Sequence, residues 1–203
     1  MLIIHYTGMP DAGSALDRLC DPAAEVSAHY LVDQDGIVWE LVPEDRRAWH
    51  AGAAFWAGEA DVNSRSIGIE LANPGHGPDY HPFSDPQMAA LERLCHGIVK
   101  RHPIPAHRVL GHSDVAPGRK IDPGELFDWR RLAQAGIGLW SDAAAGALPV
   151  DAQSLMRRFG YRDASPDAIA AFQRHFRPSA VSGLVDAETL ARLIDLLEQA
   201  GLA

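Results

Sequence analysis

One loop combines an imidazole, an ammonium and a carboxylate, the groups that metal-assisted chemistry uses. It reads GHSDVAPGRKIDPG over residues 111–124, and its two Pro-Gly pairs predict turns. Turns at these points can bring His112 and Asp122 onto one ion. Lys120 lies two residues before Asp122, so in extended backbone both side chains point the same way. The loop therefore predicts a metal site with a cation beside it.

A third donor would complete such a site. His5, at the end of the first apolar run, is the obvious candidate. Three protein ligands with one open position is the arrangement that catalytic zinc uses. A lone His-Asp pair in a loop is more often a simple hydrogen-bonded pair, so the zinc prediction depends on the rest of the sequence.

Four further segments occur in order before this loop. They read MLIIHYTG at 1–8, SAHYLV at 27–32, RAWHAG at 47–52 and NSRSIGIEL at 63–71. With the loop, they resemble the zinc-dependent N-acetylmuramoyl-L-alanine amidases of the peptidoglycan recognition protein-like superfamily, over about residues 1–135. The resemblance implies hydrolysis of the amide bond between the lactyl group of N-acetylmuramic acid and the L-alanine of the stem peptide. Peptidoglycan or its muropeptide fragments, with or without an anhydro-muramoyl end, would be the substrate.

The resemblance also implies the metal and its ligands. One Zn²⁺ per chain would be held by His5, His112 and Asp122. Zinc polarises a carbonyl and activates water, which amide hydrolysis requires. Lys120, next to the metal, would stabilise the negative charge that develops on the carbonyl oxygen.

Glu70 is the candidate general base. Strand alternation places Ser66, Gly68 and Glu70 on one face and the aliphatic residues between them on the other. An acid on this face, two residues from a glycine that leaves room, suits the floor of a cleft. The alternative is a solvated carboxylate. With the motif, Glu70 is expected to move the proton from water to the leaving amine.

Four residues are expected to contact substrate, Tyr30 and His50 by the same resemblance, and Asn63 and Arg65 by their position before the Glu70 strand. Tyr30 either hydrogen-bonds the zinc-bound water or the substrate carbonyl, or packs in the core, and the sequence does not choose. His50 is expected to line the cleft rather than act as a fourth ligand, which would close the metal site. Asn63 and Arg65 would meet stem-peptide carboxylates, Arg by paired hydrogen bonds, although ordinary turn residues look the same.

Composition excludes several functions. The 203 residues are 47% hydrophobic and 22% charged, as in globular domains, with a net charge of -9. That charge argues against a nucleic-acid partner and against electrostatic binding to anionic membranes. No segment is apolar enough to span a membrane. Cys20 and Cys95 are both expected to be buried.

Apolar periodicity predicts alternating strands and helices. The expected strands are 2–7, 28–32, 37–42, 66–72 and 108–111, and the expected helices are 12–20, 86–102 and 125–135. This order predicts an α/β fold with a mixed central sheet flanked by helices.

The C-terminal part has a different pattern. We expect a catalytic domain over 1–140, a small-residue linker over 141–149 and a three-helix domain over 150–203. The last resembles small peptidoglycan-binding domains, and on that hypothesis the first domain folds and works without it. The alternative is a helical unit that merely packs on the enzyme.

The sequence leaves two rival functions and the cellular compartment open. The alternatives are a non-catalytic peptidoglycan-binding protein and a zinc D-Ala-D-Ala peptidase, whose metal motifs have different neighbours. We expect a monomer. Domain composition favours the cell envelope or periplasm, but residues 1–4 are too short for a signal peptide and the chain begins inside the strand that carries His5. A cytoplasmic recycling role therefore stays open.

Overall fold

A five-stranded mixed sheet is the centre of the computed structural model, which describes residues 1–144 and 151–203. The strands are β1 (Leu2–Tyr6), β2 (Tyr30–Val32), β3 (Val38–Glu40), β4 (Ile67–Leu71) and β5 (Val109–Gly111), in the spatial order β3-β2-β4-β1-β5. β1 pairs in parallel with β4 and β5, and β2 pairs in parallel with β4 and antiparallel with β3. The predicted fold class is confirmed.

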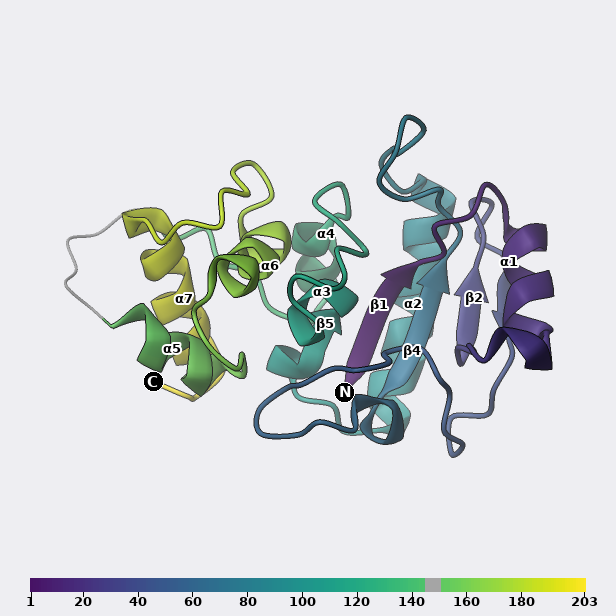
Figure 1. The fold of residues 1–203 in the computed structure, drawn as a ribbon, viewed down its shortest axis with the longest axis horizontal. Coiled ribbons are helices and arrows are strands. Elements are labelled where there is room, and N and C mark those ends of the chain that lie inside the picture. The colour runs from purple at the N-terminus through teal and green to yellow at the C-terminus, as the bar shows by residue number, and fades with distance from the viewer. Residues whose placement is uncertain (145–150) are drawn as a thin grey trace.

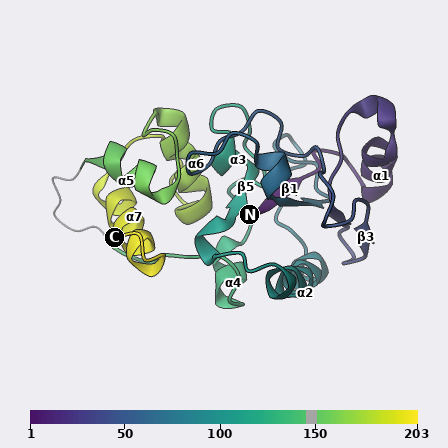
Figure 2. The ribbon, with the colours of Figure 1, turned by 90° about the horizontal axis from the view of Figure 1, so that it is seen from below.

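Helices cover both faces of the sheet (Figures 1 and 2). They are α1 (Ala12–Cys20), α2 (Asp85–Arg101), the one-turn α3 (His112–Val115) and α4 (Trp129–Gln134), with 3-10 turns η1 (Pro22–Ala24), η2 (Val62–Arg65) and η3 (Ala106–Arg108). The aliphatic residues of β4 pack with α2 and α4 in one hydrophobic cluster. Gly68 and Glu70 are therefore left for the opposite face, as alternation predicts.

Caps explain where the helices begin. The Ser84 hydroxyl accepts a hydrogen bond from the Gln87 amide at the start of α2. Helix α4 is shorter than the helix predicted over 125–135. It begins only after Asp128, which caps it by accepting a hydrogen bond from the Arg131 amide. The turn α3 was predicted as loop, and Asp114 stabilises it by accepting from the Gly111 amide.

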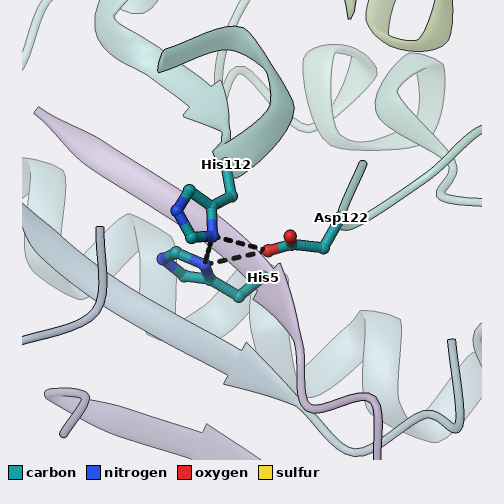
Figure 3. A group of neighbouring side chains, drawn as sticks. All are labelled: His5, His112 and Asp122. Atoms are coloured by element: carbon teal, nitrogen blue, oxygen red, sulfur yellow. Dashed lines mark hydrogen bonds and ion pairs between the residues drawn. The ribbon is translucent and has the colours of Figure 1, made fainter. Parts of the chain in front are cut away.

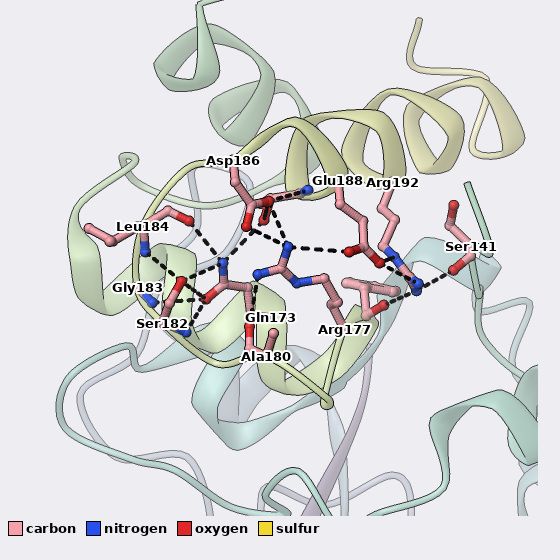
Figure 4. A network of polar contacts seen from close by, with 12 residues as sticks. Ser141, Gln173, Arg177, Ala180, Ser182, Gly183, Leu184, Asp186, Glu188 and Arg192 are labelled. Carbon is pink, nitrogen blue, oxygen red and sulfur yellow. Dashed lines mark hydrogen bonds and ion pairs between the residues drawn. The ribbon is translucent and has the colours of Figure 1, made fainter. Parts of the chain in front are cut away.

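Three helices form the C-terminal unit, as predicted. They are α5 (Ala152–Phe159), α6 (Pro166–Phe176) and α7 (Ala187–Gln199). Two side chains fix the loop between α6 and α7 (Figure 4), one within α6 and one at its C-terminal cap. Gln173 accepts from the amides of Ser182 and Gly183 and donates to the Leu184 carbonyl, and buried Arg177 pairs with Asp186, the cap of α7.

The two units share one hydrophobic cluster. It joins residues of α5, α6 and α7 to Ile3, Trp56, Leu110 and Val115 of the first unit. Gly160 lies so close to Trp56 that a Cβ would come within 2.5 Å of the indole, and the Gly160 carbonyl accepts from the Ala57 amide. This contact supports the packing alternative for the C-terminal unit. The expected linker falls largely on residues 145–150, outside the described residues.

Two smaller expectations concern cysteines and membranes. Cys95 is buried in α2 as expected, but the expectation for Cys20 is wrong, because this last residue of α1 is exposed. Among the helices of the two described ranges, none combines the length and the hydropathy that a membrane crossing needs.

Candidate metal centre and active site

The candidate site lies where the carboxyl ends of β1, β4 and β5 meet, the edge at which open α/β sheets bind ligands. His5 of β1 is in register with Glu70 of β4, so both side chains point to the same face. His112 follows directly after β5. The Ser113 amide donates to the carbonyl of Asp122 over 2.9 Å, which holds the second half of the loop beside the first.

The three predicted ligands meet in a buried triangle (Figure 3). The Nδ1 atoms of His5 and His112 are 3.0 Å apart, and each is 3.0 Å from Oδ2 of Asp122. A tetrahedral zinc ion with bonds of about 2.0–2.1 Å places its ligands roughly 3.3 Å from one another. The donor types and spacing therefore fit a single zinc ion.

A backbone carbonyl orients His112. The His112 Nε2–H donates to the Ala51 carbonyl over 3.0 Å, so the Nδ1 lone pair faces the other two ligands. Arg119 donates to the same carbonyl and to that of Ala53. It thereby holds the segment that supports the ligand.

A hydrogen-bonded chain orients His5. Its Nε2 donates to Nδ1 of His50 over 3.0 Å, and Nε2 of His50 donates to the Ser66 hydroxyl, which donates to the Val62 carbonyl. Gly68 makes room, because a Cβ there would lie 2.4 Å from the His50 ring. His50 thus lines the cleft, as predicted, and also fixes the tautomer of His5.

The charges in the triangle match what a metal requires. Burial, assisted by His112, lowers the pKa of His5 to about 4, so its imidazole is neutral. Burial acts to raise the pKa of Asp122, but its close contacts with His112 and then with His5 outweigh burial and lower that pKa. A neutral imidazole on His5 and an ionised carboxylate on Asp122 are protonation states that bind metal.

Glu70 and Lys120 line a cleft of about 300 Å³ beside the triangle. Glu70 lines the cleft although its side chain is largely buried. Among the residues that the structure describes, its Oε2 has no hydrogen-bond partner. Burial, then the charge of Asp122, raises the pKa of Glu70 well above its usual range, and Lys120 opposes this. A carboxyl group that readily takes up a proton, with one oxygen free, is suited to general-base chemistry.

Tyr30 does not reach this cleft. Leu31, not Tyr30, is in register with Glu70, so Tyr30 faces the opposite side of the sheet and packs in the cluster beneath α2. Its hydroxyl donates to Glu44 over 2.8 Å. The expected contact with substrate is therefore corrected, and the core alternative describes this residue.

Asn63 and Arg65 also have other partners. The Asn63 carbonyl oxygen accepts from the amides of His50 and Ala51, so Asn63 supports the segment that orients both of the predicted histidine ligands. Arg65 pairs with Glu59 near the surface. The structure does not bring either residue into the wall of the cleft.

Trp49 was missed by the sequence reasoning. This residue is 54% exposed and lines the cleft next to His50. No periodicity marks this position, because Trp49 lies in an irregular segment whose path depends on distant contacts. An exposed indole beside a cleft offers an apolar surface to a substrate.

Comparisons with known proteins agree with this geometry. Residues 1–125 match the family model described as N-acetylmuramoyl-L-alanine amidase. The amidase AmiD of Escherichia coli (strain K12) is 43% identical over 99% of this chain and 83% of its own length. The 1,6-anhydro-N-acetylmuramyl-L-alanine amidase AmpD of Enterobacter cloacae is 38% identical, over 65% of this chain and 78% of its own length.

Two solved structures resemble the whole fold. One is AmiD from E. coli in complex with the substrate anhydro-N-acetylmuramic acid-L-Ala-D-gamma-Glu-L-Lys, with a TM-score of 0.90 and 41% identity, covering 100% of this chain and 90% of that one. The other is AMPDH3 from Pseudomonas aeruginosa in complex with anhydromuramic pentapeptide, with a TM-score of 0.89 and 34% identity, covering 98% and 91%.

Proposed function

The chain belongs to the N-acetylmuramoyl-L-alanine amidase family, and from this we infer that it is an enzyme that hydrolyses the amide bond between N-acetylmuramic acid and the L-alanine of the stem peptide. The observation that carries this function is the triangle of His5, His112 and Asp122 beside the free carboxylate oxygen of Glu70. The candidate metal ligands thus lie beside the candidate general base, with His5 and Glu70 on the same face of the sheet.

We propose that the metal is a zinc ion, held by Nδ1 of His5, Nδ1 of His112 and Oδ2 of Asp122. Bound there, zinc would supply a Lewis acid that polarises the amide carbonyl and activates water. Neutral nitrogen donors with one carboxylate are within its preferred ligand set, and three protein ligands leave a position open.

The chain's own residues then handle the proton and the developing charge. Glu70 takes a proton from the attacking water and returns it to the nitrogen of the leaving L-alanine. Lys120 places its ammonium in the cleft wall, where it stabilises the negative charge on the carbonyl oxygen of the tetrahedral intermediate. His50 keeps His5 in the tautomer that leaves Nδ1 free.

The substrate class follows from the relatives and the cleft. Both complexes described above hold anhydro-muramoyl peptides, which supports fragments with that end as substrates of this chain. Trp49 would offer its indole to the sugar or lactyl part of such a fragment. We further propose that the chain acts as a monomer, in the cell envelope, where wall fragments arise.

Metal removal tests this proposal. The protein is incubated with purified muropeptides that carry either anhydro or reduced muramoyl ends, with a chelator or with zinc-saturated chelator as the control. We expect release of a peptide that begins with L-alanine and loss of this release with free chelator. After the chelator is removed, one equivalent of zinc per protein chain should restore the release. Undiminished cleavage by protein shown to be metal-free would contradict the proposed zinc chemistry.

A further inference from the structure

A buried carboxylate joins the C-terminal unit to the backbone beside the metal ligands. Asp114, two residues after His112, is 1% exposed. Its Oδ1 accepts from the Tyr161 hydroxyl over 2.5 Å, and its Oδ2 accepts from Nδ1 of His175 over 2.7 Å and from the Gly111 amide over 2.7 Å. Two of the three donors therefore come from the C-terminal unit.

Both of those donors are themselves fixed by packing on the first unit. The Tyr161 ring packs edge-on against Trp56, with 4.8 Å between centroids. The His175 imidazole stacks on Trp129, with 3.7 Å between centroids and 23° between planes. Burial and the charge of Asp114 raise the pKa of Tyr161 well above its usual range, so its hydroxyl keeps the proton that it donates.

Asp114 in turn fixes the backbone that carries two of the ligands. The Gly111 amide lies at the junction of β5 and α3, so the carboxylate sets the turn from which His112 projects. The Ser113 amide, inside this turn, holds the carbonyl of Asp122. A movement of the turn would therefore displace His112 and Asp122 together.

A carboxylate removed from water depends on its hydrogen-bond donors, and the loss of one donor is costly. Without Tyr161 and His175, Asp114 would retain only the Gly111 amide among these three donors. It would then turn toward water, and the α3 turn would move with it.

We propose that the C-terminal unit is a positioning element of the active centre: Tyr161 and His175 hold Asp114, and Asp114 sets the geometry of the two ligand-bearing segments and hence the affinity for the metal. This inference rests on the proposed function, because it concerns the same metal site. It assigns the unit a role besides any binding of the wall.

Tyr161→Phe in the full chain tests the proposal, because it removes only the hydroxyl and keeps the ring against Trp56. Zinc affinity is measured by competition with a chromophoric chelator, and turnover is measured at limiting and saturating zinc. We expect affinity to fall about tenfold and most of kcat to return at saturating zinc, as for other groups that orient metal ligands.

Ser141→Ala is the matched control. The buried Ser141 hydroxyl also donates to a carboxylate, Asp195 Oδ2, over 2.5 Å. Neither residue lines the cleft that contains the predicted metal ligands. This variant should lose thermal stability and keep the zinc affinity of the wild type. A structural role for Tyr161 would make the two variants alike, with a lower Tm and unchanged zinc affinity.

Two variants of His175 separate hydrogen bonding from packing and serve equally if Tyr161→Phe does not fold. His175→Phe keeps a ring over Trp129 and removes the donor, whereas His175→Asn keeps an amide N–H near the position of Nδ1 and removes the ring. We expect about tenfold weaker zinc binding for His175→Phe and affinity within about twofold of wild type for His175→Asn.

The outcomes distinguish this inference from the proposed function. Wild-type zinc affinity in both Tyr161→Phe and His175→Phe would overturn the positioning role and leave the amidase assignment intact. A wild-type protein that binds no zinc at the predicted site would instead overturn the metal assignment on which both depend.

Discussion

Replacing Glu70 by glutamine is expected to lower kcat about 10³-fold, within the range for loss of a general base, while the zinc content stays at the wild-type level. Glutamine keeps the shape of the side chain but cannot take a proton from water. The carboxylate is the group in the cleft with a free oxygen and a raised pKa, and it does not belong to the metal triangle. Turnover of a defined muropeptide and metal analysis of the same samples measure the two effects.

Glu40→Gln is the control for this prediction. Glu40 is an exposed residue of β3 in the same sheet, so the variant removes an equal charge away from the cleft. It should retain the kcat of the wild type. A near-normal kcat in Glu70→Gln would remove Glu70 from the role of base and require another proton carrier.

Replacing Asp122 by alanine is expected to weaken zinc binding by more than about 10²-fold and to reduce hydrolysis to background. The variant removes the anionic ligand of the triangle and the oxygen that lies 3.0 Å from both Nδ1 atoms. Only two neutral nitrogens would remain. Zinc affinity by chelator competition and circular dichroism at room temperature distinguish loss of metal from loss of fold.

Asp45→Ala provides the comparison, because Asp45 is an exposed aspartate whose ion pair with Arg46 has a long distance of 3.9 Å. It should bind zinc and cleave substrate as the wild type does. Full metal content and full activity in Asp122→Ala would show that Asp122 is not a ligand.

The sequence was sufficient for features that depend on local periodicity and on one compact loop. The alternation in β4 correctly separated the aliphatic face from Gly68 and Glu70, and the turns in residues 111–124 bring His112 and Asp122 together. The helix expected over 86–102 is likewise observed as α2, over Asp85–Arg101. These features rest on residues close in sequence.

Features set by strand register were not predictable in the same way. Tyr30 was a candidate for the cleft, but whether it or Leu31 faces Glu70 depends on the pairing of β2 with β4. A shift of one residue exchanges the two faces. The sequence alone offers no measure of that register.

Long-range contacts of irregular segments were also beyond the sequence. His50 was expected to touch substrate, and its hydrogen bond to His5 joins residues 45 positions apart. The hydrogen bond between Tyr161 and Asp114 joins two units that the sequence pattern separates. Such contacts follow from tertiary packing, which propensity and periodicity do not encode.

The most direct test of the amidase assignment is to locate the oxygen that hydrolysis adds. The wild-type protein with zinc is incubated with an anhydro-muropeptide in water enriched in oxygen-18, and the products are fragmented in a mass spectrometer. We expect the heavy oxygen in the lactyl carboxylate of the sugar product and an unlabelled peptide with a free L-alanine amine. Heavy oxygen in a peptide carboxylate, or an intact muropeptide with zinc bound to the protein, would contradict the assignment.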